Sequence, residues 1–289
     1  IIEADAFPSD IYAVESHIRH HGLDPSESLI KLKPREGEII IRNEDIMSII
    51  EQNCDSVSLI MLGGVNYYTG QVFDMQKITK EAHKHNILVG FDLAHAVGNI
   101  ALSLHDWGVD FAVWCSYKYL NSGPGSVAGV FIHEKHHNKN VERFAGWWGH
   151  DKESRFKMPD EFVPIKSAEG WQLSNPPILS LAAVRAALSL FDEVGMTSLV
   201  TKSKKLTSYL EFLLNQIPTE RIKIITPAQR GCQISISVKN GNQDLFDEIT
   251  KRGVIADWRE PDVIRVAPVP LYNSYLDVYN FYKILSESL

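Results

Sequence analysis

The sequence has few cysteines and no long apolar run, and each shortage excludes a class of protein. Only three cysteines occur in 289 residues, Cys54, Cys115 and Cys232, and none belongs to a CxxC pair. This spacing argues against a disulfide scaffold or a zinc site and is typical of a reducing compartment, so we expect a cytoplasmic protein without a bound metal. No apolar run approaches the length of a membrane span, so we expect no membrane partner.

The sequence also lacks an excess of positive charge. Lysine and arginine total 29 against 36 aspartates and glutamates, which gives a formal net charge of −7, and no basic block occurs. Nucleic-acid partners and anionic lipid surfaces are therefore not expected. A hydrophobic content of 44% is ordinary for a folded core. We expect a globular protein whose partner is a small molecule.

The first half of the chain alternates apolar runs with amphipathic segments. The runs SVSLIML (56–62), ILVGFD (87–92) and VDFAVWC (109–115) are short and rich in β-branched and aromatic residues, which is typical of buried parallel strands. The segments EDIMSIIEQ (44–52) and DMQKITKEAHKH (74–85) have the pattern of helices. This alternation predicts an α/β fold with a mostly parallel sheet and helices on both faces.

The second half changes character after residue 150. A loop-like, proline-containing stretch precedes a long helix predicted to begin near Leu179. Short strand-like segments then alternate with helices up to a last helix from Tyr275, which predicts a small α+β domain. We expect a large cofactor-binding domain over residues 1–175, and a linking helix with a small C-terminal domain over residues 176–289.

Two side chains suited to chemistry follow two of the predicted strands. Asp92 ends the run 87–92, and Lys118 lies just beyond the run 109–115. Parallel strands end at one edge of a sheet, where open α/β proteins bind ligands, so we expect both side chains to face one cleft. Taken singly, a capping or ion-paired aspartate and a solvated lysine are the simpler interpretations. Taken together they fit pyridoxal phosphate, which needs a lysine for its aldehyde and a carboxylate for its pyridinium nitrogen.

Further motifs are spread over essentially the whole chain. They are AFPSD (6–10), YYTGQ (67–71), FDLAHAVGN (91–99), LHDWGVDFAVWCSYKYLNSGPG (104–125), FIHEKH (131–136), RFKM (155–158), SNPPIL (174–179), RGCQ (230–233) and RVAPVPLYNS (265–274). In these segments the sequence resembles kynureninase, a pyridoxal phosphate-dependent family with the aspartate-aminotransferase fold. The resemblance implies hydrolysis of the Cβ–Cγ bond of L-kynurenine or 3-hydroxykynurenine to an anthranilate and L-alanine, a step of tryptophan catabolism and NAD biosynthesis, by a homodimer.

The resemblance also implies that the sequence belongs to a longer chain. It opens with IIEAD, without a methionine, and the likeness begins well inside the family's large domain. We therefore expect a preceding segment that completes the sheet and part of the phosphate cup, and weak cofactor binding without it.

The resemblance assigns cofactor contacts residue by residue. Lys118 would form the Schiff base, Asp92 would pair with the pyridinium nitrogen, and Tyr117 would reach the phosphate and relay protons. Phe7 would stack on the ring, and His95 would touch the cofactor or hold Asp92. The remaining cofactor contacts implied by the resemblance are Pro8, Ser9, Asp10, Gly63, Trp147 and Asn175.

Two assignments concern the substrate and one departs from the family. Asn175 would contact the substrate, and Arg265 would clamp its α-carboxylate, a bidentate task suited to a guanidinium. Gly63 stands where the family commonly has a serine, so a hydroxyl contact to the phosphate is expected to be missing. On residue type alone, His95 would be a structural histidine, and Arg265 would be a solvated or ion-paired arginine.

Two alternative functions stay open. A cysteine desulfurase-like lyase would share the aspartate and lysine but would need a nucleophilic cysteine on a mobile loop. The three cysteines lie at the ends of predicted elements, where we expect them to be inert. A non-catalytic module of the same fold is the other alternative. A dinucleotide-binding loop at SGPGSVAG (122–129) is disfavoured because its glycines miss the GxGxxG spacing.

Overall fold

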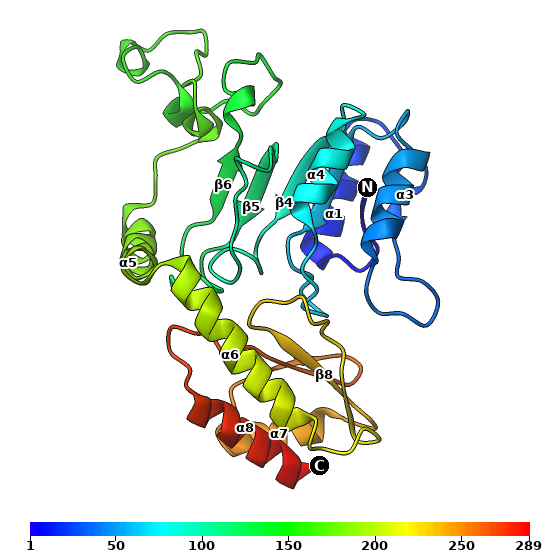
Figure 1. The fold of residues 1–289 in the computed structure, drawn as a ribbon. Helices are drawn as coiled ribbons and strands as arrows, with labels where there is room; N and C mark the ends of the chain where they lie inside the picture. The colour runs from blue at the N-terminus through cyan, green and yellow to red at the C-terminus, as the bar shows by residue number, and fades with distance from the viewer.

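The computed structural model describes residues 1–289, and Figure 1 shows two sheet-containing parts joined by a long helix. The strands are β1 (Ile2–Glu3), β2 (Lys31–Leu32), β3 (Leu59–Gly63), β4 (Leu88–Asp92), β5 (Phe111–Trp114), β6 (Gly129–Ile132), β7 (Ile222–Ile224), β8 (Ile234–Val238), β9 (Asp257–Arg259) and β10 (Val263–Val266). The α-helices are α1 (Pro8–His20), α2 (Pro25–Ser28), α3 (Asn43–Gln52), α4 (Met75–His83), α5 (Ile178–Val194), α6 (Met196–Leu214), α7 (Gln243–Lys251) and α8 (Tyr275–Ser288).

The first part is built on a four-stranded sheet with the order β3-β4-β5-β6. Strands β3, β4 and β5 run parallel, and β6 pairs antiparallel with β5. The register places Asp92 between Gly63 and Val113, so the carboxyl ends of β3 and β4 are level. The amino end of the chain lies beside β3, because the amine of Ile1 donates to the carbonyl of Leu59 at 2.8 Å. The α/β class and the parallel strands expected from the sequence are confirmed.

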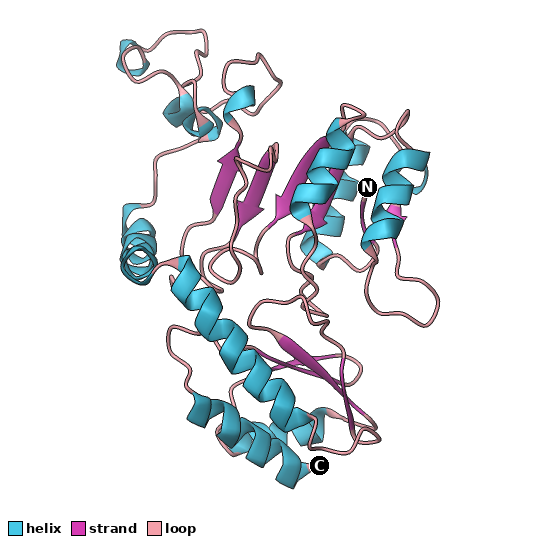
Figure 2. Cartoon of the chain, viewed as in Figure 1, coloured by secondary structure: helices cyan, strands magenta, loops and turns pink.

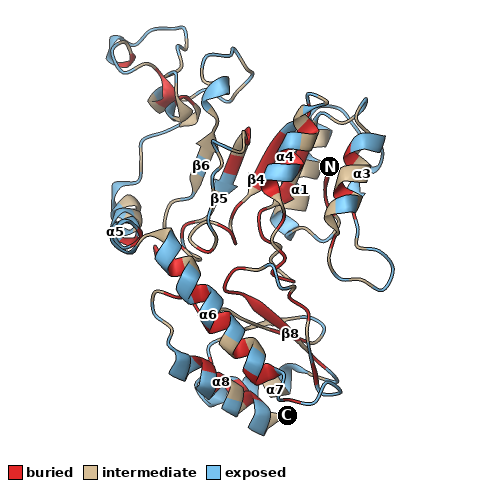
Figure 3. Cartoon of the chain, in the orientation of Figure 1, coloured by how far each residue is buried: buried red, intermediate tan, exposed pale blue.

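A core of 19 buried residues fills the first part. Phe91 of β4, Ile60 of β3 and Ile78 of α4 are fully buried in it. Figure 3 shows the burial concentrated in the central strands and in the inner face of the helix beside them. Apolar side chains that alternate along strands and recur every three to four residues along helices account for this packing.

The second part has an antiparallel sheet with the order β7-β8-β10-β9. A separate core of 15 buried residues packs this sheet against α6, α7 and α8, and it includes Leu206, Ile236 and Leu285. Figure 2 shows these three helices together on one side of the small sheet. The apolar side chains around Leu206 in α6 belong to this core. None of the helices of the structure combines the length and the apolarity needed to cross a bilayer.

The structure corrects the expected elements at several places. The single long helix predicted from Leu179 is two helices, because Gly195 adopts a φ of 78° between α5 and α6. Such a conformation favours glycine and ends a helix. Strand β2 is only two residues long, and β9 begins at Asp257. Between residues 134 and 177 the chain forms only short 3₁₀ turns, and Figure 1 shows this green segment extending away from the sheet.

Candidate active site

A cleft of about 260 Å³ opens at the carboxyl edge of the parallel strands. Its walls come from the chain end before α1, from the ends of β3, β4 and β5, and from the loop after β5. The lining residues are Glu3, Ala6, Phe7, Ser9, Asp10, Gly63, Val65, Asn66, Tyr67, Asp92, Ala94, His95, Val113, Trp114, Cys115, Tyr117, Lys118 and Ala128. Asp92 and Lys118 therefore share one cleft, as strand order predicts.

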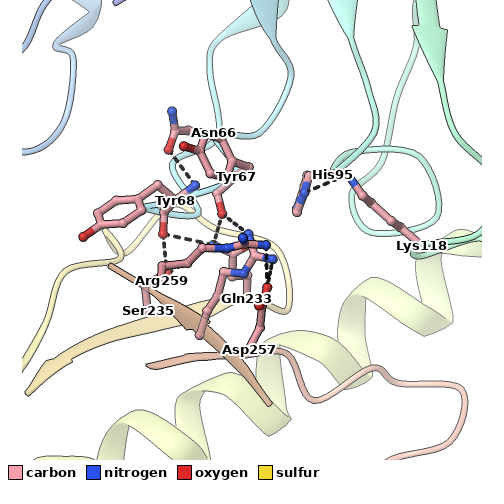
Figure 4. Close-up of polar contacts among 10 residues, drawn as sticks. Asn66, Tyr67, Tyr68, His95, Lys118, Gln233, Ser235, Asp257 and Arg259 are labelled. Atoms are coloured by element: carbon pink, nitrogen blue, oxygen red, sulfur yellow. Dashed lines mark hydrogen bonds and ion pairs between the residues drawn. The ribbon is translucent and has the colours of Figure 1, made fainter. Parts of the chain in front are cut away.

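Lys118 is held by a buried histidine. Its Nζ lies 3.2 Å from Nε2 of His95, as Figure 4 shows. Burial, together with the nearby positive charge of Lys118, lowers the pKa of His95 to about 3. The imidazole is therefore neutral at physiological pH and can accept a hydrogen bond from the lysine. The sequence interpretation allowed His95 to hold Asp92, and the structure shows it bonded to Lys118 instead.

Asp92 keeps most of its hydrogen-bonding capacity. One carboxylate oxygen accepts from the backbone N–H of Ala94 at 2.7 Å. Asp10 lies beside it, and its pKa is raised to about 7 by burial, by the charge of Asp92 and by a hydrogen bond between the two carboxyls. A carboxylate can accept about four hydrogen bonds, so Asp92 can still bind a cationic ring nitrogen.

Phe7 forms an aromatic wall of the cleft. Its ring centroid lies 5.6 Å from Nζ of Lys118 and 5.3 Å from the ring of Tyr67, which meets it edge-on. Phe7 is also the N-cap of α1. The helix begins at Pro8, because proline is well accommodated in a first turn. Pro8 itself is not among the cleft-lining residues.

Glu3 is a cleft residue that the sequence interpretation missed. It is buried, and its two oxygens accept from the N–H of Gly63 and from Nδ2 of Asn66, each at 2.7 Å. Burial raises the pKa of Glu3 to about 7, although these two hydrogen bonds oppose the shift. The available signal was an acid in the apolar opening segment, where an unpaired charge would be costly.

The structure gives a steric reason for the glycine at position 63, where the family commonly has a serine. A Cβ at this position would lie 2.9 Å from Oε1 of Glu3, so a serine would force Glu3 to move. The N–H of Gly63 donates to the same oxygen. Gly63 therefore lines the cleft but has its backbone donor already paired.

Tyr117 and Cys115 lie on the wall near Lys118. The tyrosine is 54% exposed, and the nearby Cys115 raises the pKa of its hydroxyl. The sequence interpretation treated all three cysteines as inert. Cys232 fits that view, because burial raises the pKa of its thiol to about 12, whereas Cys115 lines the cleft.

Arg265 approaches the cleft from the C-terminal sheet. Its Nη1 donates to the carbonyl of Tyr67 at 2.5 Å, and its Nη2 pairs with Asp257. Gln233 donates to the same Tyr67 carbonyl at 3.1 Å, and Ser235 donates to the carbonyl of Tyr68 at 2.5 Å. Figure 4 shows how this group joins the small sheet to the turn after β3. Arg265 thus lies behind the cleft wall and is not itself a lining residue.

Trp147 and Asn175 are not brought to this cleft. The indole of Trp147 donates to the carbonyl of Arg155 at 3.3 Å and packs edge-on against Phe156. Asn175 is exposed in the loop before α5. Both belong to the segment that extends away from the sheet.

The side chains of the cleft fit pyridoxal phosphate. An amine, a carboxylate and an aromatic ring are present together in Lys118, Asp92 and Phe7, and the hydroxyls of Ser9 and Tyr117 lie on the same walls. These are the groups needed for the cofactor's aldehyde, ring nitrogen, ring face and phosphate.

Comparison with known proteins places the chain among kynureninases. The family model described as "Kynureninase C-terminal domain" matches residues 199–285. The kynureninase of Myxococcus xanthus is 56% identical over 289 residues, which cover 99% of this chain and 68% of the relative. The kynureninase of Flavobacterium psychrophilum is 54% identical, with coverages of 100% and 70%. The mouse kynureninase is 49% identical, with coverages of 100% and 65%.

Solved structures of low sequence identity share the fold. The apo cysteine desulfurase of Thermococcus onnurineus aligns with a TM-score of 0.77 at 14% identity, covering 99% of this chain and 71% of the other. A C-DES variant with glycine covalently linked to its pyridoxal phosphate cofactor aligns with a TM-score of 0.79 at 16% identity, with coverages of 99% and 73%. By its sequence relatives, the chain belongs to the kynureninase family, and it has the fold of these pyridoxal phosphate-type enzymes.

Proposed function

We propose that the protein is a pyridoxal phosphate-dependent hydrolase that cleaves the Cβ–Cγ bond of L-kynurenine, 3-hydroxykynurenine or both. The products are the corresponding anthranilate and L-alanine. The observation that carries the proposal is the presence of Lys118 and Asp92 in one cleft of a chain that belongs to the kynureninase family. Membership supports the substrate class, and the cleft supports the chemistry.

Lys118 and Asp92 would bind the cofactor, and Asp92 would stabilise the positive charge of its ring nitrogen. Lys118 would attach to the aldehyde, and after substrate displaces it, its amine would take the proton from Cα. The neutral imidazole of His95 would orient that amine through the 3.2 Å contact. Asp92 would hold the ring nitrogen protonated. Bound pyridoxal phosphate supplies an electron sink for the negative charge that develops on the substrate.

Other residues would act on the substrate. Arg265 would bind the α-carboxylate, after a local adjustment at the Tyr67 carbonyl that it contacts. Tyr117 would move protons between the α-proton loss, the addition of water to the γ-carbonyl and the release of the product carbanion. Its position on the wall near Lys118 and its partial exposure support that role.

A homodimer in the cytoplasm is the assembly and location that we propose. Trp147 and Asn175 lie outside the cleft of their own chain, so their cofactor and substrate contacts would be made at the cleft of a second copy. Phe144 and Phe156 on the same extended segment, and Leu179 in the first turn of α5, are exposed apolar side chains, which supports a partner surface. We also propose domains over 1–175 and 176–289, a division supported by the two separate cores.

The test is anthranilate release by purified protein supplied with pyridoxal phosphate. Kynurenine, 3-hydroxykynurenine or both should yield product, and Lys118→Ala should abolish turnover. Lys135→Ala is the matched control, because Lys135 is also a partly exposed lysine but contacts Asp110 at the other edge of the sheet. Release of sulfide from L-cysteine without turnover of kynurenine would reject the proposal, as would equal losses in the two variants.

A further inference from the structure

Three charged side chains gather on one face of the C-terminal sheet. Asp257 and Arg259 are two residues apart in β9, so alternation places them on the same face. Arg265 in β10 pairs directly with Asp257 across the ladder, and its other neighbour is Ser235 of β8. Figure 4 shows this face turned toward the loop that carries Tyr67.

One carboxylate serves both guanidinium groups. Oδ2 of Asp257 accepts from Nη2 of Arg259 at 2.7 Å and also from Nη2 of Arg265. The guanidinium of Arg259 lies 6.0 Å from the ring centroid of Tyr67, which lines the cleft. Since arginines are always charged in proteins, this charged triad of Asp257, Arg259 and Arg265 carries a net charge of +1.

The triad acts on the cleft as well as on itself. The positive charges of Arg265 and Arg259 both contribute to the lowered pKa of His95, after burial and the charge of Lys118. The side chain of Arg265 is 13% exposed, whereas those of Arg259 and Asp257 are 35% and 40% exposed. Arg265 is thus the inner member, and the outer pair faces partly toward solvent.

We propose that Arg259 is a positioning residue that controls the affinity for the substrate α-carboxylate by limiting the pairing of Asp257 with Arg265. The inference rests on the proposed function, in which Arg265 binds that carboxylate. Asp257 and the substrate carboxylate carry like charges and use the same guanidinium, so they compete for it. Arg259 draws part of the hydrogen bonding of Asp257 to itself and so weakens the hold of Asp257 on Arg265. Without Arg259, Asp257 and Arg265 form a neutral ion pair, and Asp257 directs all its pairing to Arg265.

A double-mutant cycle with steady-state kinetics of kynurenine tests this coupling. Arg259→Gln should raise KM about tenfold while kcat changes less than about twofold, because only carboxylate recognition is affected. Arg259→Lys, which keeps the charge, should raise KM less. Asp257→Asn should not raise KM, because the competitor is neutralised. In Asp257→Asn/Arg259→Gln, KM should stay close to that of Asp257→Asn.

Arg252→Gln is the matched control, because Arg252 also pairs with an acid, Glu287, but its hydrogen bonds go to residues of α8 and not to the charged triad. It should leave KM unchanged. A tenfold rise in KM from Arg259→Gln that persists in the Asp257→Asn background would overturn the proposal, as would an unchanged KM. If Arg259→Gln does not fold, a raised KM in Asp257→Asn overturns it. Absence of kynurenine turnover in the unaltered protein would instead reject the proposed function.

Discussion

Two aspartates at opposite edges of the same sheet have opposite environments. Asp92 ends β4 at the carboxyl edge, whereas Asp110 precedes β5 at the amino edge. Asp110 accepts from His83, His136, Lys135 and the N–H of Val89, at 2.7 to 2.9 Å. Asp92 has one backbone donor and a neighbouring carboxyl. A carboxylate whose partners are all internal stabilises the fold, while one that lacks them can bind a ligand.

The largest expected effect is on catalysis at the carboxyl edge. Asp92→Asn should lower kcat by about 10²–10³-fold, because it removes a charge interaction that strengthens as the reaction proceeds. Its melting temperature should change little, since few internal hydrogen bonds are lost. Asp110→Asn is the matched variant and should retain kcat. Near-normal turnover in a well-folded Asp92→Asn protein would contradict the assignment of a catalytic role to Asp92 and a structural role to Asp110.

The second expected effect is on stability at the amino edge. Asp110→Asn should lower the free energy of unfolding by about 3 kcal/mol, because it removes the buried negative charge, and one of the two acceptor oxygens, that two histidines and a lysine share. Chemical denaturation monitored by circular dichroism measures this difference, with Asp92→Asn as control. A smaller loss in Asp110→Asn than in Asp92→Asn would show that the two carboxylates do not differ in this way.

A third effect sharpens the comparison at the substrate side. Arg265→Lys should lower kcat/KM for kynurenine by about 10–100-fold, because an ammonium cannot reproduce a bidentate guanidinium contact. Cofactor absorbance should remain, since Arg265 does not line the cleft that holds Lys118. Loss of cofactor with retained substrate affinity would assign Arg265 to the phosphate or to structure.

The smallest effects are on the pH dependence of stability. Asp110 at the amino edge and Glu3 at the carboxyl edge should change stability in opposite directions as the pH rises. Hydrogen bonds outweigh burial and hold the pKa of Asp110 at about 2, below its usual 3.8. Its contribution is therefore present above pH 3.8 and is lost as the pH falls toward 2. Burial raises the pKa of Glu3 from 4.5 to about 7, so its contribution is present below pH 4.5 and is lost as the pH rises through 7.

Melting temperatures measured across the pH range show how stability changes with pH. Asp110→Asn should flatten the acid limb between pH 4 and 2, and Glu3→Gln should flatten the decline between pH 4.5 and 7. Each variant is the control for the other, because it should leave the other limb unchanged. Identical curves for all three proteins would show that neither carboxyl is linked to folding as described.

The features that could be predicted from the sequence are those that depend on the local pattern of apolar residues. Apolar runs located β3, β4 and β5, and the rule that parallel strands end at one edge brought Asp92 and Lys118 together. The break at Gly195 was missed because the helical pattern continues on both sides of it. A single glycine is tolerated inside many helices, so its effect here depends on the surrounding packing.

Contacts between distant segments could not be predicted. Arg265 and Tyr67 are 198 positions apart, and Glu3 and Gly63 are 60 positions apart. No periodicity links such residues, because their meeting depends on how segments far apart in the sequence pack together. The placement of Trp147 away from the cleft was equally invisible, since its segment has no regular elements to orient it.

The most direct test compares two lysines, one at each edge of the sheet. Borohydride reduction of the protein loaded with pyridoxal phosphate, followed by peptide mapping, identifies the lysine that carries the cofactor. We expect the pyridoxyl group on Lys118, which lies in the cleft beside His95. A pyridoxyl group on Lys135, which belongs to the Asp110 cluster, or on no lysine at all, would contradict the assignment of chemistry to the carboxyl edge.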